Sequence, residues 1–458
     1  MQDLNTEFIE RVRDMHEGDT YVLTTHGCQM NEHDSEKIKT LLDTMGFREI
    51  DDENEADLAI INTCSVRHSA EDKVIGHIGR LKHVKKKNKD LKVAVCGCMM
   101  QRKESRDYVL ETFPHVDIVF GTNNIHRLPQ LILESDDRNT TVVDIEQSYS
   151  NLDNRIFSKV DGHSAYVNII YGCNNFCTYC IVPYTRGREI SRSPEDILEE
   201  IEALVEDGVN EVTLLGQNVN SYGKTLEEKT TFAELLHMVH AIDGIDRIHF
   251  TTSHPKDVSD ELIACYGELP KLANYLHLPV QSGSNDVLRA MNRHYTREDY
   301  FKLIDKLRAV RPDISLSTDI MVGFPGETDE DFEDTLDLVR RVRYDNAFTF
   351  IYSRREGTRA DVMENQVPKS IKDERFQRLL DEVYAIQREK YEELHGTVQD
   401  VLFDSISKND DSMMSGRTSG FKLVHAPYDA DRIGKLTPVK ITGGNTFSLR
   451  GEIVHATK

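Results

Sequence analysis

The chain has 458 residues, of which 38% are hydrophobic and 29% charged, and its net charge is −23. This composition is typical of a soluble globular protein with about three domains, and it excludes collagen-like, coiled-coil and wholly disordered classes. No stretch approaches the roughly 18 consecutive apolar residues of a membrane span, and the charged N-terminus lacks the apolar core of a signal peptide. We therefore expect a cytoplasmic protein with no membrane partner, whose eight cysteines are reduced, metal-bound or catalytic.

Short apolar runs alternate with helical stretches from residue 21 to about residue 144. Residues 21–25, 58–62 and 92–96 are predicted as buried strands, and a helical segment follows each of them. This alternation predicts a parallel sheet with flanking helices. The polar stretch that follows, in which Asn, Asp and Ser become more frequent, is expected to be a linker.

A second alternating series begins at residue 165. Its predicted strands are residues 165–171, 211–215, 247–251, 275–278, 315–321 and 347–352. Its predicted helices are residues 194–206, 232–242, 259–267, 297–310 and 329–341. Six βα units are two short of a closed eightfold barrel. The pattern therefore predicts an open, partial barrel with its active site at the C-terminal ends of the strands.

The C-terminal part is predicted as a long helix and a small barrel. An amphipathic helix is expected over residues 372–395, with Gly396 ending it. Roughly 60 residues with short strands and turn dipeptides follow, which is typical of a β-barrel of the oligonucleotide-binding kind.

The charge distribution leaves a nucleic-acid partner open. A net charge of −23 argues mildly against binding to phosphates. Lysines and arginines nevertheless crowd into residues 80–92. That run is either the solvated face of a helix or a phosphate-binding surface, and the sequence pattern does not decide between them.

Three cysteines follow the first predicted barrel strand at close spacing. Cys173, Cys177 and Cys180 form a Cys-x-x-x-Cys-x-x-Cys triplet. Three thiolates at this spacing can hold three corners of an iron–sulfur cube and leave one iron open. Zinc is the alternative, but it needs a fourth protein ligand, and no His or Cys follows at zinc-ribbon spacing.

A second cysteine group is spread over the first predicted sheet. Cys28, Cys64 and Cys98 each follow one of its strands. Parallel strands would bring these cysteines to one edge of the sheet, where open α/β sheets bind ligands. They could then form a second three-ligand cluster site; the alternative is three buried thiols that never meet.

Two further cysteines need an interpretation. Because side chains alternate along a strand, Cys96 and Cys98 would face the same way, and the pattern cannot choose between them as the third ligand. Cys265 lies in a helical apolar pattern and is interpreted as a core thiol.

Several motifs resemble a known enzyme family. The Cys173 triplet, with Tyr179 before its last cysteine, resembles the radical S-adenosylmethionine (AdoMet) signature. The strings at residues 27–31, 62–67 and 97–98 are similar to the N-terminal domain of the methylthiotransferases. The strings at residues 177–188, 215–223, 252–255, 277–283 and 321–328 resemble one branch, the tRNA-2-methylthio-N6-dimethylallyladenosine synthases. The resemblance extends from about residue 20 to residue 455.

The resemblance implies an α/β multidomain protein. Residues 1–18 would be an N-terminal extension, residues 19–137 a flavodoxin-like methylthiotransferase domain with a parallel sheet, and residues 138–158 a linker. Residues 159–390 would form the radical AdoMet core, a partial (β/α)6 barrel. Residues 391–458 would form a small β-barrel, a TRAM-like domain that binds RNA.

The same resemblance implies the reaction and its cofactors. The family methylthiolates C2 of N6-dimethylallyladenosine at position 37 of tRNA in two AdoMet-dependent steps, methyl transfer to a cluster-bound sulfur and then radical attack at C2. The cofactors would be AdoMet and two [4Fe-4S] clusters. The resemblance assigns the auxiliary cluster to Cys28, Cys64 and Cys98, because the family's third ligand follows a glycine, and the AdoMet-binding cluster to the Cys173 triplet. All six cysteines would be catalytic.

Polar residues near the predicted C-terminal strand ends are the expected AdoMet contacts. We name Gln217, Asn218, Ser253, Gln281, Ser282, Asp319, Arg186 and Arg188. Each could instead cap a helix or satisfy a loop. The two arginines could meet the AdoMet carboxylate, a tRNA phosphate or a surface carboxylate.

The expected partners follow from this assignment. They are a tRNA that carries N6-dimethylallyladenosine, bound by the TRAM-like tail and the run at residues 82–92, and a low-potential electron donor of the flavodoxin or ferredoxin type. The sulfur donor stays open, and a monomer is expected. Two other functions are considered: a sister methylthiotransferase that acts on threonylcarbamoyl-adenosine in tRNA or on a ribosomal-protein aspartate, and a non-catalytic iron–sulfur tRNA-binding protein. The string at residues 27–31 favours the dimethylallyl-adenosine substrate over those of the sister enzymes.

Overall fold

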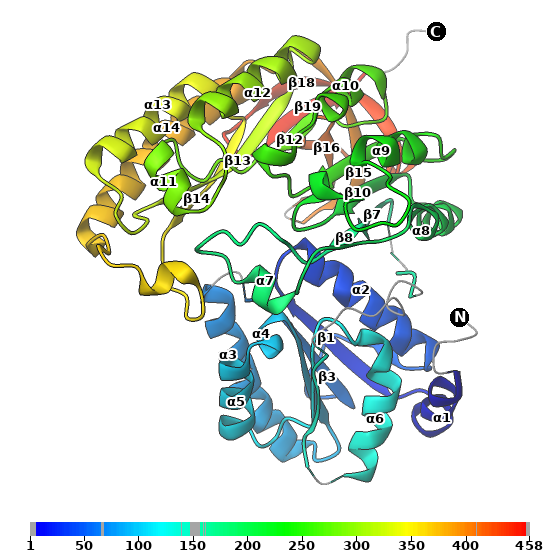
Figure 1. The fold of residues 1–458 in the computed structure, drawn as a ribbon. Helices are drawn as coiled ribbons and strands as arrows, with labels where there is room; N and C mark the ends of the chain where they lie inside the picture. The colour runs from blue at the N-terminus through cyan, green and yellow to red at the C-terminus, as the bar shows by residue number, and fades with distance from the viewer. Residues whose placement is uncertain are drawn as a thin grey trace. The chain divides into compact units, whose positions relative to one another are not determined.

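A computed structural model describes residues 6–65, 68–138, 140–146, 156–158, 160, 162–408 and 410–454. The chain divides into two compact units (Figure 1). The first unit contains Met1–Val160, Tyr166–Asn174 and Cys180–Asp207, and the second contains Asp161–Ala165, Asn175–Tyr179 and Gly208–Lys458. Among the described residues, no helix combines the length and the apolar character that crossing a membrane requires.

The first unit is built on a six-stranded parallel sheet in the order β2-β1-β3-β4-β5-β6. Its strands are β1 (Thr20–His26), β2 (Arg48–Glu49), β3 (Leu58–Thr63), β4 (Lys92–Gly97), β5 (Ile118–Phe120) and β6 (Val142–Asp144). This is the flavodoxin-like order with one more strand at the edge. The predicted parallel sheet is therefore confirmed.

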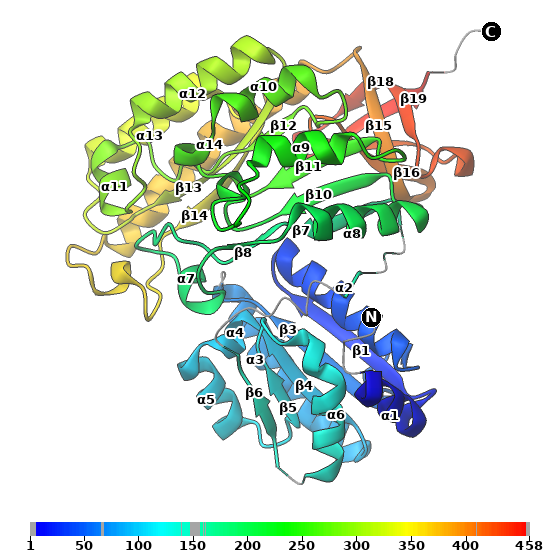
Figure 2. The same cartoon turned by 45° about the vertical axis from the view of Figure 1, so that its right-hand side comes forward.

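Helices cover both faces of this sheet (Figure 2). One core packs α1 (Thr6–His16), α2 (Gln29–Thr44) and α6 (Leu128–Asp137) against one face. The other core packs α3 (His68–Lys87) and α5 (Lys103–Thr112) against the opposite face. Because both faces are covered, the strands contain continuous apolar runs such as residues 58–61 of β3, a strand that is buried throughout.

Two segments differ from the sequence-based expectation. The predicted linker supplies β6, which pairs with β5 and extends the sheet beyond residue 137. The predicted N-terminal extension forms α1, whose Val12 is buried in the core of the sheet. Short apolar stretches next to polar residues show little of the hydrophobic periodicity that predicts secondary structure. Tertiary packing nevertheless stabilises them as a helix and a strand.

The six strands predicted for the partial barrel form two three-stranded sheets, in the orders β11-β10-β7 and β12-β13-β14. The strands are β7 (Ser164–Asn168), β10 (Glu211–Leu215), β11 (Arg247–Thr251), β12 (Tyr275–His277), β13 (Ser315–Val322) and β14 (Asn346–Ile351). A parallel bridge from Ile248 to Leu272 links the region of β11 to the chain before β12. The accompanying helices are α8 (Pro194–Glu206), α9 (Phe232–His240), α10 (Asp260–Glu268), α11 (Asn285–Ala290), α12 (Arg297–Val310) and α13 (Asp329–Val342).

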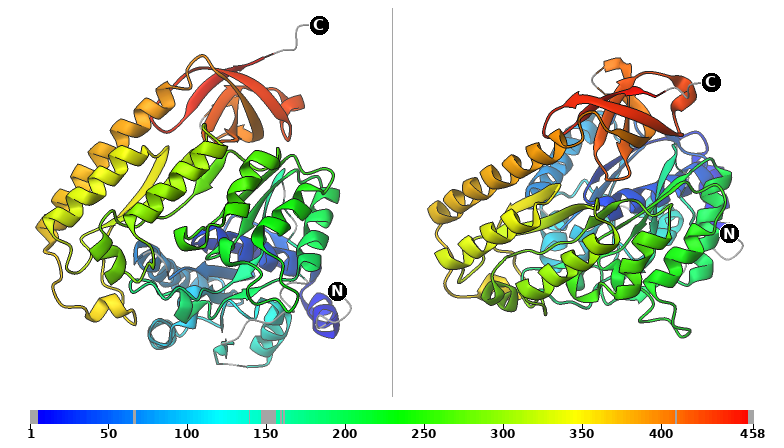
Figure 3. Two further views of the ribbon diagram at one scale, coloured as in Figure 1. Left: turned by 45° about the horizontal axis from the view of Figure 1, so that its top comes forward. Right: turned by 90° about the horizontal axis from the view of Figure 1, so that it is seen from above.

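The C-terminal tail is a closed five-stranded barrel, as predicted, and follows the long helix α14 (Lys369–Glu392) (Figure 3). Its strands are β15 (Val398–Ser407), β16 (Asp410–Thr418), β17 (Leu423–Pro427), β18 (Leu436–Gly444) and β19 (Leu449–Ile453).

Within the second unit, the barrel of the tail docks at the amino ends of the parallel strands. Arg247, the first residue of β11, donates to the carbonyls of Asp400 (3.1 Å) and Arg417 (2.8 Å). Phe421 stacks on Tyr275, the first residue of β12, with ring centroids 4.9 Å apart. The carboxyl ends of the same strands are therefore left to other elements.

Candidate functional site

The three N-terminal cysteines lie at one edge of the first unit's sheet. Cys28 follows β1 and caps the N-terminus of α2, Cys64 directly follows β3, and Cys98 directly follows β4 as the first residue of the short helix α4 (Cys98–Gln101). The three strands are parallel neighbours, so the cysteines leave the sheet at its carboxyl edge. The strand order reverses between β1 and β3, which is where open α/β sheets bind ligands.

The protonation behaviour of these thiols reflects their proximity. A hydrogen bond from Cys64 lowers the pKa of Cys28, and so do the charge of Arg186 and nearby backbone amides, against the effect of burial. Burial raises the pKa of Cys98, Arg186 lowers it, and the charge of Cys28 raises it further. Among the described residues, no three His, Cys, Asp or Glu side chains converge on the position of a single metal ion. A four-iron cluster instead needs one thiolate at each of several irons, and this triad fits that requirement.

Two asparagines of the quoted motifs hold the cysteine loops together. Asn31 accepts from the backbone amide of Cys28 (3.3 Å) and donates to Asn62 Oδ1 (3.2 Å) and to the Thr63 carbonyl (3.1 Å). Asn62 returns a bond to the Asn31 carbonyl (2.9 Å). Both asparagines lie in the motifs at residues 27–31 and 62–67, but the sequence alone predicted no role for them. Their signal was their place three residues after Cys28 and two residues before Cys64.

A glycine precedes Cys98 for a steric reason. Gly97 has φ +97°, and a Cβ there would lie 2.4 Å from the Thr63 carbonyl oxygen and 2.5 Å from Asn62 Oδ1. Any larger residue would push apart the loops that carry Cys64 and Cys98.

The structure separates Cys96 from Cys98. Cys96 lies in β4, and its side chain is part of the apolar core with Ile118 and Phe120, where burial raises its pKa well above the usual value. Cys98 belongs to a helix, so strand alternation does not relate the two residues. These positions favour Cys98 as the third ligand, and the assignment stays a prediction.

Two cysteines of the Cys173 triplet, Cys173 and Cys180, belong to the first unit. Cys173 follows β8 (Ile170–Tyr171), and its backbone amide donates to the Gly187 carbonyl (3.2 Å). Gly172 has φ +67°, and a Cβ there would lie 2.2 Å from the Arg188 carbonyl oxygen. Cys180 stands just before the short helix α7 (Val182–Thr185) and is half-buried.

Cys177 belongs to the second unit, where the chain beyond α11 holds its loop. The amide of Asn292 donates to the carbonyls of Asn175 and Phe176, each at 3.1 Å. Arg293 directs one guanidinium N–H to the sulfur of Cys177 at 3.5 Å and another to the Pro279 carbonyl at 2.7 Å. Arg293 is 4% exposed, and sequence reasoning missed it.

Several polar side chains at the carboxyl ends of β10 and β11 each have a buried atom without a hydrogen-bond partner among the described residues. Asn218 donates to Asp257 (2.7 Å), but its Oδ1 has no partner among the described residues, and the same holds for Ser253 Oγ. His254 accepts from the Lys256 amide at Nδ1 (3.3 Å), and burial, followed by the charge of Arg293, lowers its pKa. The neutral ring therefore carries its proton on Nε2, which is also buried without a partner in the described part of the chain.

These buried groups fit a polar small molecule such as AdoMet, because burying them without a hydrogen bond is unfavourable. Asn218 and Ser253 were predicted as AdoMet contacts, and His254 was missed although its motif was quoted.

The other predicted AdoMet residues are placed as follows. Gln281 has φ +70°, and its backbone amide donates to the Asp319 backbone carbonyl (2.8 Å). Ser282 Oγ lies 3.3 Å from the hydroxyl of Thr335. Asp319 lies in β13, with Oδ1 3.7 Å from Nε2 of His277. Gln217 is half-buried beside Asn218, and Arg188 is exposed in the first unit. Their contacts with AdoMet stay predictions.

Arg186 forms a buried ion pair in the structure. It is buried in the first unit, with its guanidinium 2.7 Å from Asp34 Oδ2 and 3.2 Å from Cys98 Sγ. A buried ion pair of this kind is not the surface salt bridge that was the alternative. Its neighbours associate it with the N-terminal cysteines.

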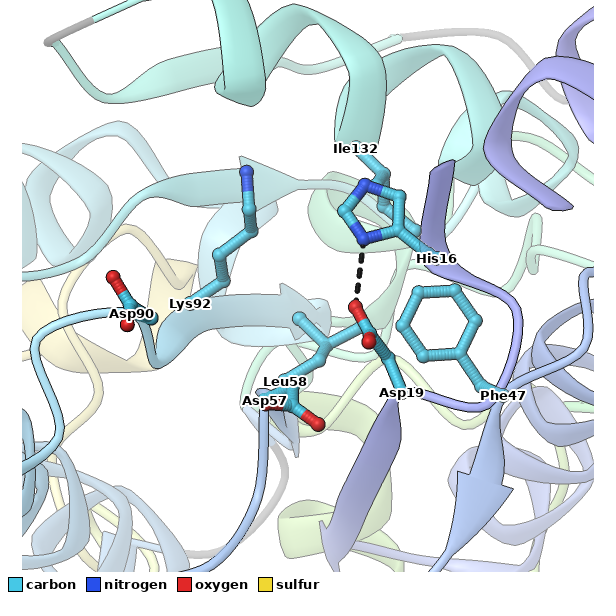
Figure 4. A pocket seen from close by; sticks show the side chains of 8 residues that line it. All are labelled: His16, Asp19, Phe47, Asp57, Leu58, Asp90, Lys92 and Ile132. Atoms are coloured by element: carbon cyan, nitrogen blue, oxygen red, sulfur yellow. Dashed lines mark hydrogen bonds and ion pairs between the residues drawn. The ribbon is translucent and has the colours of Figure 1, made fainter. Parts of the chain in front are cut away.

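One pocket in the first unit is lined by none of its cysteines Cys28, Cys64 and Cys98. It has a volume of about 280 Å³ and lies by the amino ends of β1, β3 and β4, lined by Asp19, Asp57 and Lys92 among others (Figure 4). His16 bonds Asp19 there at 2.8 Å and so ties α1 to the start of β1. The pocket is therefore explained by the anchoring of α1.

The lysines of the basic run at residues 80–92 differ in their surroundings. Lys85 donates to the His115 carbonyl (3.1 Å) and forms an ion pair with Asp117, so it belongs to the packing of α3. Lys82, Lys86, Lys87 and Lys89 are exposed.

Comparison with known proteins agrees with this arrangement. Residues 20–121 match the uncharacterized protein family UPF0004, residues 167–339 the radical SAM superfamily and residues 392–454 the TRAM domain. A tRNA-2-methylthio-N6-dimethylallyladenosine synthase of Finegoldia magna is 55% identical over 95% of this chain and 94% of its own. The chain belongs to this synthase family. The synthase of Clostridioides difficile is 52% identical over 94% of this chain and 91% of its own.

Among solved structures, the radical AdoMet methyltransferase TsrM from Kitasatospora setae, with cobalamin and a [4Fe-4S] cluster bound, superposes with a TM-score of 0.56. It is 13% identical, and the match covers 75% of this chain and 74% of that chain. At this identity the likeness supports the fold alone.

Proposed function

We propose that the chain methylthiolates C2 of N6-dimethylallyladenosine at position 37 of tRNA. The observation that supports this most is the triad Cys28, Cys64 and Cys98 at the carboxyl edge of the sheet, in a chain that also carries the Cys173 triplet. The Cys173 triplet would hold the cluster that cleaves AdoMet. Sulfur insertion requires a second three-cysteine site in addition to this one. The named relatives catalyse this same chemistry.

Two [4Fe-4S] clusters and AdoMet, when bound, supply the radical and sulfur-transfer chemistry that an aromatic C–H requires. The protein's own contribution is positioning. Asn31 and Asn62 hold the loops of Cys28 and Cys64 in register. Cys28, Cys64 and Cys98 can each give one thiolate, and three thiolates leave one iron of a cluster for a non-protein ligand.

AdoMet is proposed to bind at the carboxyl ends of β10 and β11. Oδ1 of Asn218 and Nε2–H of His254, which have no partner among the described residues, offer one acceptor and one donor there, and Ser253 offers a hydroxyl. Their burial excludes water from the groups that they bind, which strengthens each hydrogen bond.

The tail is proposed to hold the tRNA at a distance from the target base. Its barrel docks at the amino ends of the strands, whereas the proposed AdoMet site lies at their carboxyl ends. The tail therefore contributes affinity, and the strand ends contribute the chemistry.

The exposed lysines of α3 are proposed as a second tRNA-binding surface. We expect Lys86→Glu/Lys87→Glu to weaken tRNA binding and to reduce the slope of log affinity against log salt by about 1 for each phosphate that the variant no longer neutralises. The measurement is tRNA affinity at several salt concentrations.

The control is Lys229→Glu, which reverses an exposed lysine in the loop before α9. Equal affinity and slope for wild type and the Lys86/Lys87 variant would mean that this run is only solvated.

Two competing functions can be separated in one assay. Reconstituted protein would be incubated with AdoMet, sulfide, a reductant and either dimethylallyl- or threonylcarbamoyl-modified tRNA. We expect 5′-deoxyadenosine with either tRNA, and a methylthio product only with the dimethylallyl-modified tRNA. A product with the second tRNA would favour the sister enzyme, and no 5′-deoxyadenosine at all would favour a non-catalytic tRNA-binding protein.

The remaining partners are proposed from the same chemistry. Reduction of an AdoMet-binding cluster needs a low-potential electron donor of the flavodoxin or ferredoxin type. We further propose a cytoplasmic monomer.

A further inference from the structure

Arg186 joins the two cysteine-bearing parts of the first unit. It stands six residues after Cys180, and its guanidinium reaches Asp34 of α2 and Cys98 at the start of α4. The Nη2–Oδ2 distance to Asp34 is 2.7 Å, and the Nε–Sγ distance to Cys98 is 3.2 Å. Arg186 and Asp34 are both buried.

This arginine keeps its charge in the interior. The guanidinium is always protonated in proteins, and the buried carboxylate of Asp34, 2.7 Å away, compensates its charge. A charged N–H donor is roughly twice as strong as a neutral one, and its planar fork fixes the direction of each bond. The Nε–H is thus directed at a cysteine sulfur while Asp34 holds the other side of the fork.

Hydrogen bonds to ligand sulfurs are one of the ways in which a protein sets the reduction potential of an iron–sulfur cluster. Adding one electron makes a cluster more negative, and an N–H directed at a ligand sulfur stabilises that form more than the oxidised one. We propose that Arg186 is a positioning residue that orients Cys98 and raises the reduction potential of the auxiliary cluster. This inference rests on the proposed function, which places a cluster on Cys28, Cys64 and Cys98.

The test is a redox titration with dithionite as the electron donor, followed by electron paramagnetic resonance. It uses the full chain with Cys173, Cys177 and Cys180 replaced by serine, so that the signal belongs to the auxiliary cluster. In this background Arg186→Gln/Asp34→Asn removes both charges together, because a lone buried carboxylate would itself be strongly destabilising.

The double variant is expected to keep its iron and to become about tenfold harder to reduce, which corresponds to a midpoint lower by about 59 mV for one electron. An unchanged midpoint with full iron would overturn the proposal. If the double variant fails to fold, Arg186→Lys replaces it, because lysine keeps the charge but not the Nε–H. The midpoint should then still fall, and an unchanged one would again overturn the proposal.

A matched control is available in the same unit. Arg192 and Glu200 form another buried ion pair, and the Arg192 guanidinium is directed to Glu200 and to the carbonyls of Asn168 and Asp196. Arg192→Gln/Glu200→Gln should leave the midpoint unchanged, and an equal shift would overturn the specific role of Arg186. A serine background that binds no iron at all would overturn the auxiliary-cluster site itself, and with it both proposals.

Discussion

Replacing Cys98 with serine is expected to remove about half of the bound iron, whereas Cys96→Ser keeps all of it. Cys98 leads α4 at the carboxyl edge of the sheet and accepts from Arg186, while Cys96 is packed in the apolar core. Product formation should be abolished in the first variant and retained in the second. Iron analysis after anaerobic reconstitution, together with the visible absorption of the clusters, measures the difference.

The two variants control for each other, because each replaces one buried thiol at the carboxyl end of β4 by serine. Retained iron in Cys98→Ser with lost iron in Cys96→Ser would reverse the ligand assignment. Equal loss in both would indicate general destabilisation of β4 instead of ligand removal.

Arg293→Met is expected to reduce 5′-deoxyadenosine formation about 10- to 100-fold, the usual effect of losing a partner of a metal ligand. Arg293 is buried, donates to the sulfur of Cys177, to the Pro279 carbonyl and to the Tyr295 hydroxyl, and pairs with no described carboxylate. An uncompensated buried cation is unfavourable by several kcal/mol. The negative charge of a thiolate-ligated cluster is the natural compensation.

This charge balance gives Arg293 a thermal signature. In the iron-free protein, Arg293→Met should leave the melting temperature unchanged or raise it. In the iron-loaded protein, the same substitution should lower the melting temperature. Arg375→Met is the control, because Arg375 is equally buried but pairs with Glu327 and Asp329 and should destabilise both forms. Equal destabilisation of both forms by Arg293→Met would contradict a role at the cluster.

Local sequence signals were enough for most of the fold. The predicted bounds of β10, β11, α8 and α12 agree with the structure. The two strands are short, largely buried runs, and in the two helices apolar periodicity coincides with strong caps. Ser193 accepts from the Asp196 amide, with Pro194 in the first turn, and Thr296 forms a capping box with Asp299. β6 lacks such signals: it has three residues, only one of them buried, and depends on pairing with β5.

The candidate site was predictable only where spacing along the chain carries the chemistry. The six cysteines could be named because each group follows predicted strands. The roles of Arg186 and Arg293 could not, since Arg186 lies 88 residues from Cys98 and 152 from Asp34, and Arg293 lies 116 from Cys177. Pairings at such separations are set by the fold, and no local pattern announces them. Lys85 shows the same limit, because its pairing with Asp117 is invisible in the basic run.

Mass spectrometry of nucleosides tests most directly whether this chain methylthiolates dimethylallyl-adenosine in tRNA. Dimethylallyl-modified tRNA would be incubated anaerobically with iron-reconstituted protein, AdoMet, sulfide and a reductant, then digested. We predict a 2-methylthio-N6-dimethylallyladenosine product with wild type and its absence with Cys98→Ser. Abundant 5′-deoxyadenosine without any methylthio product would contradict the proposed methylthiolation.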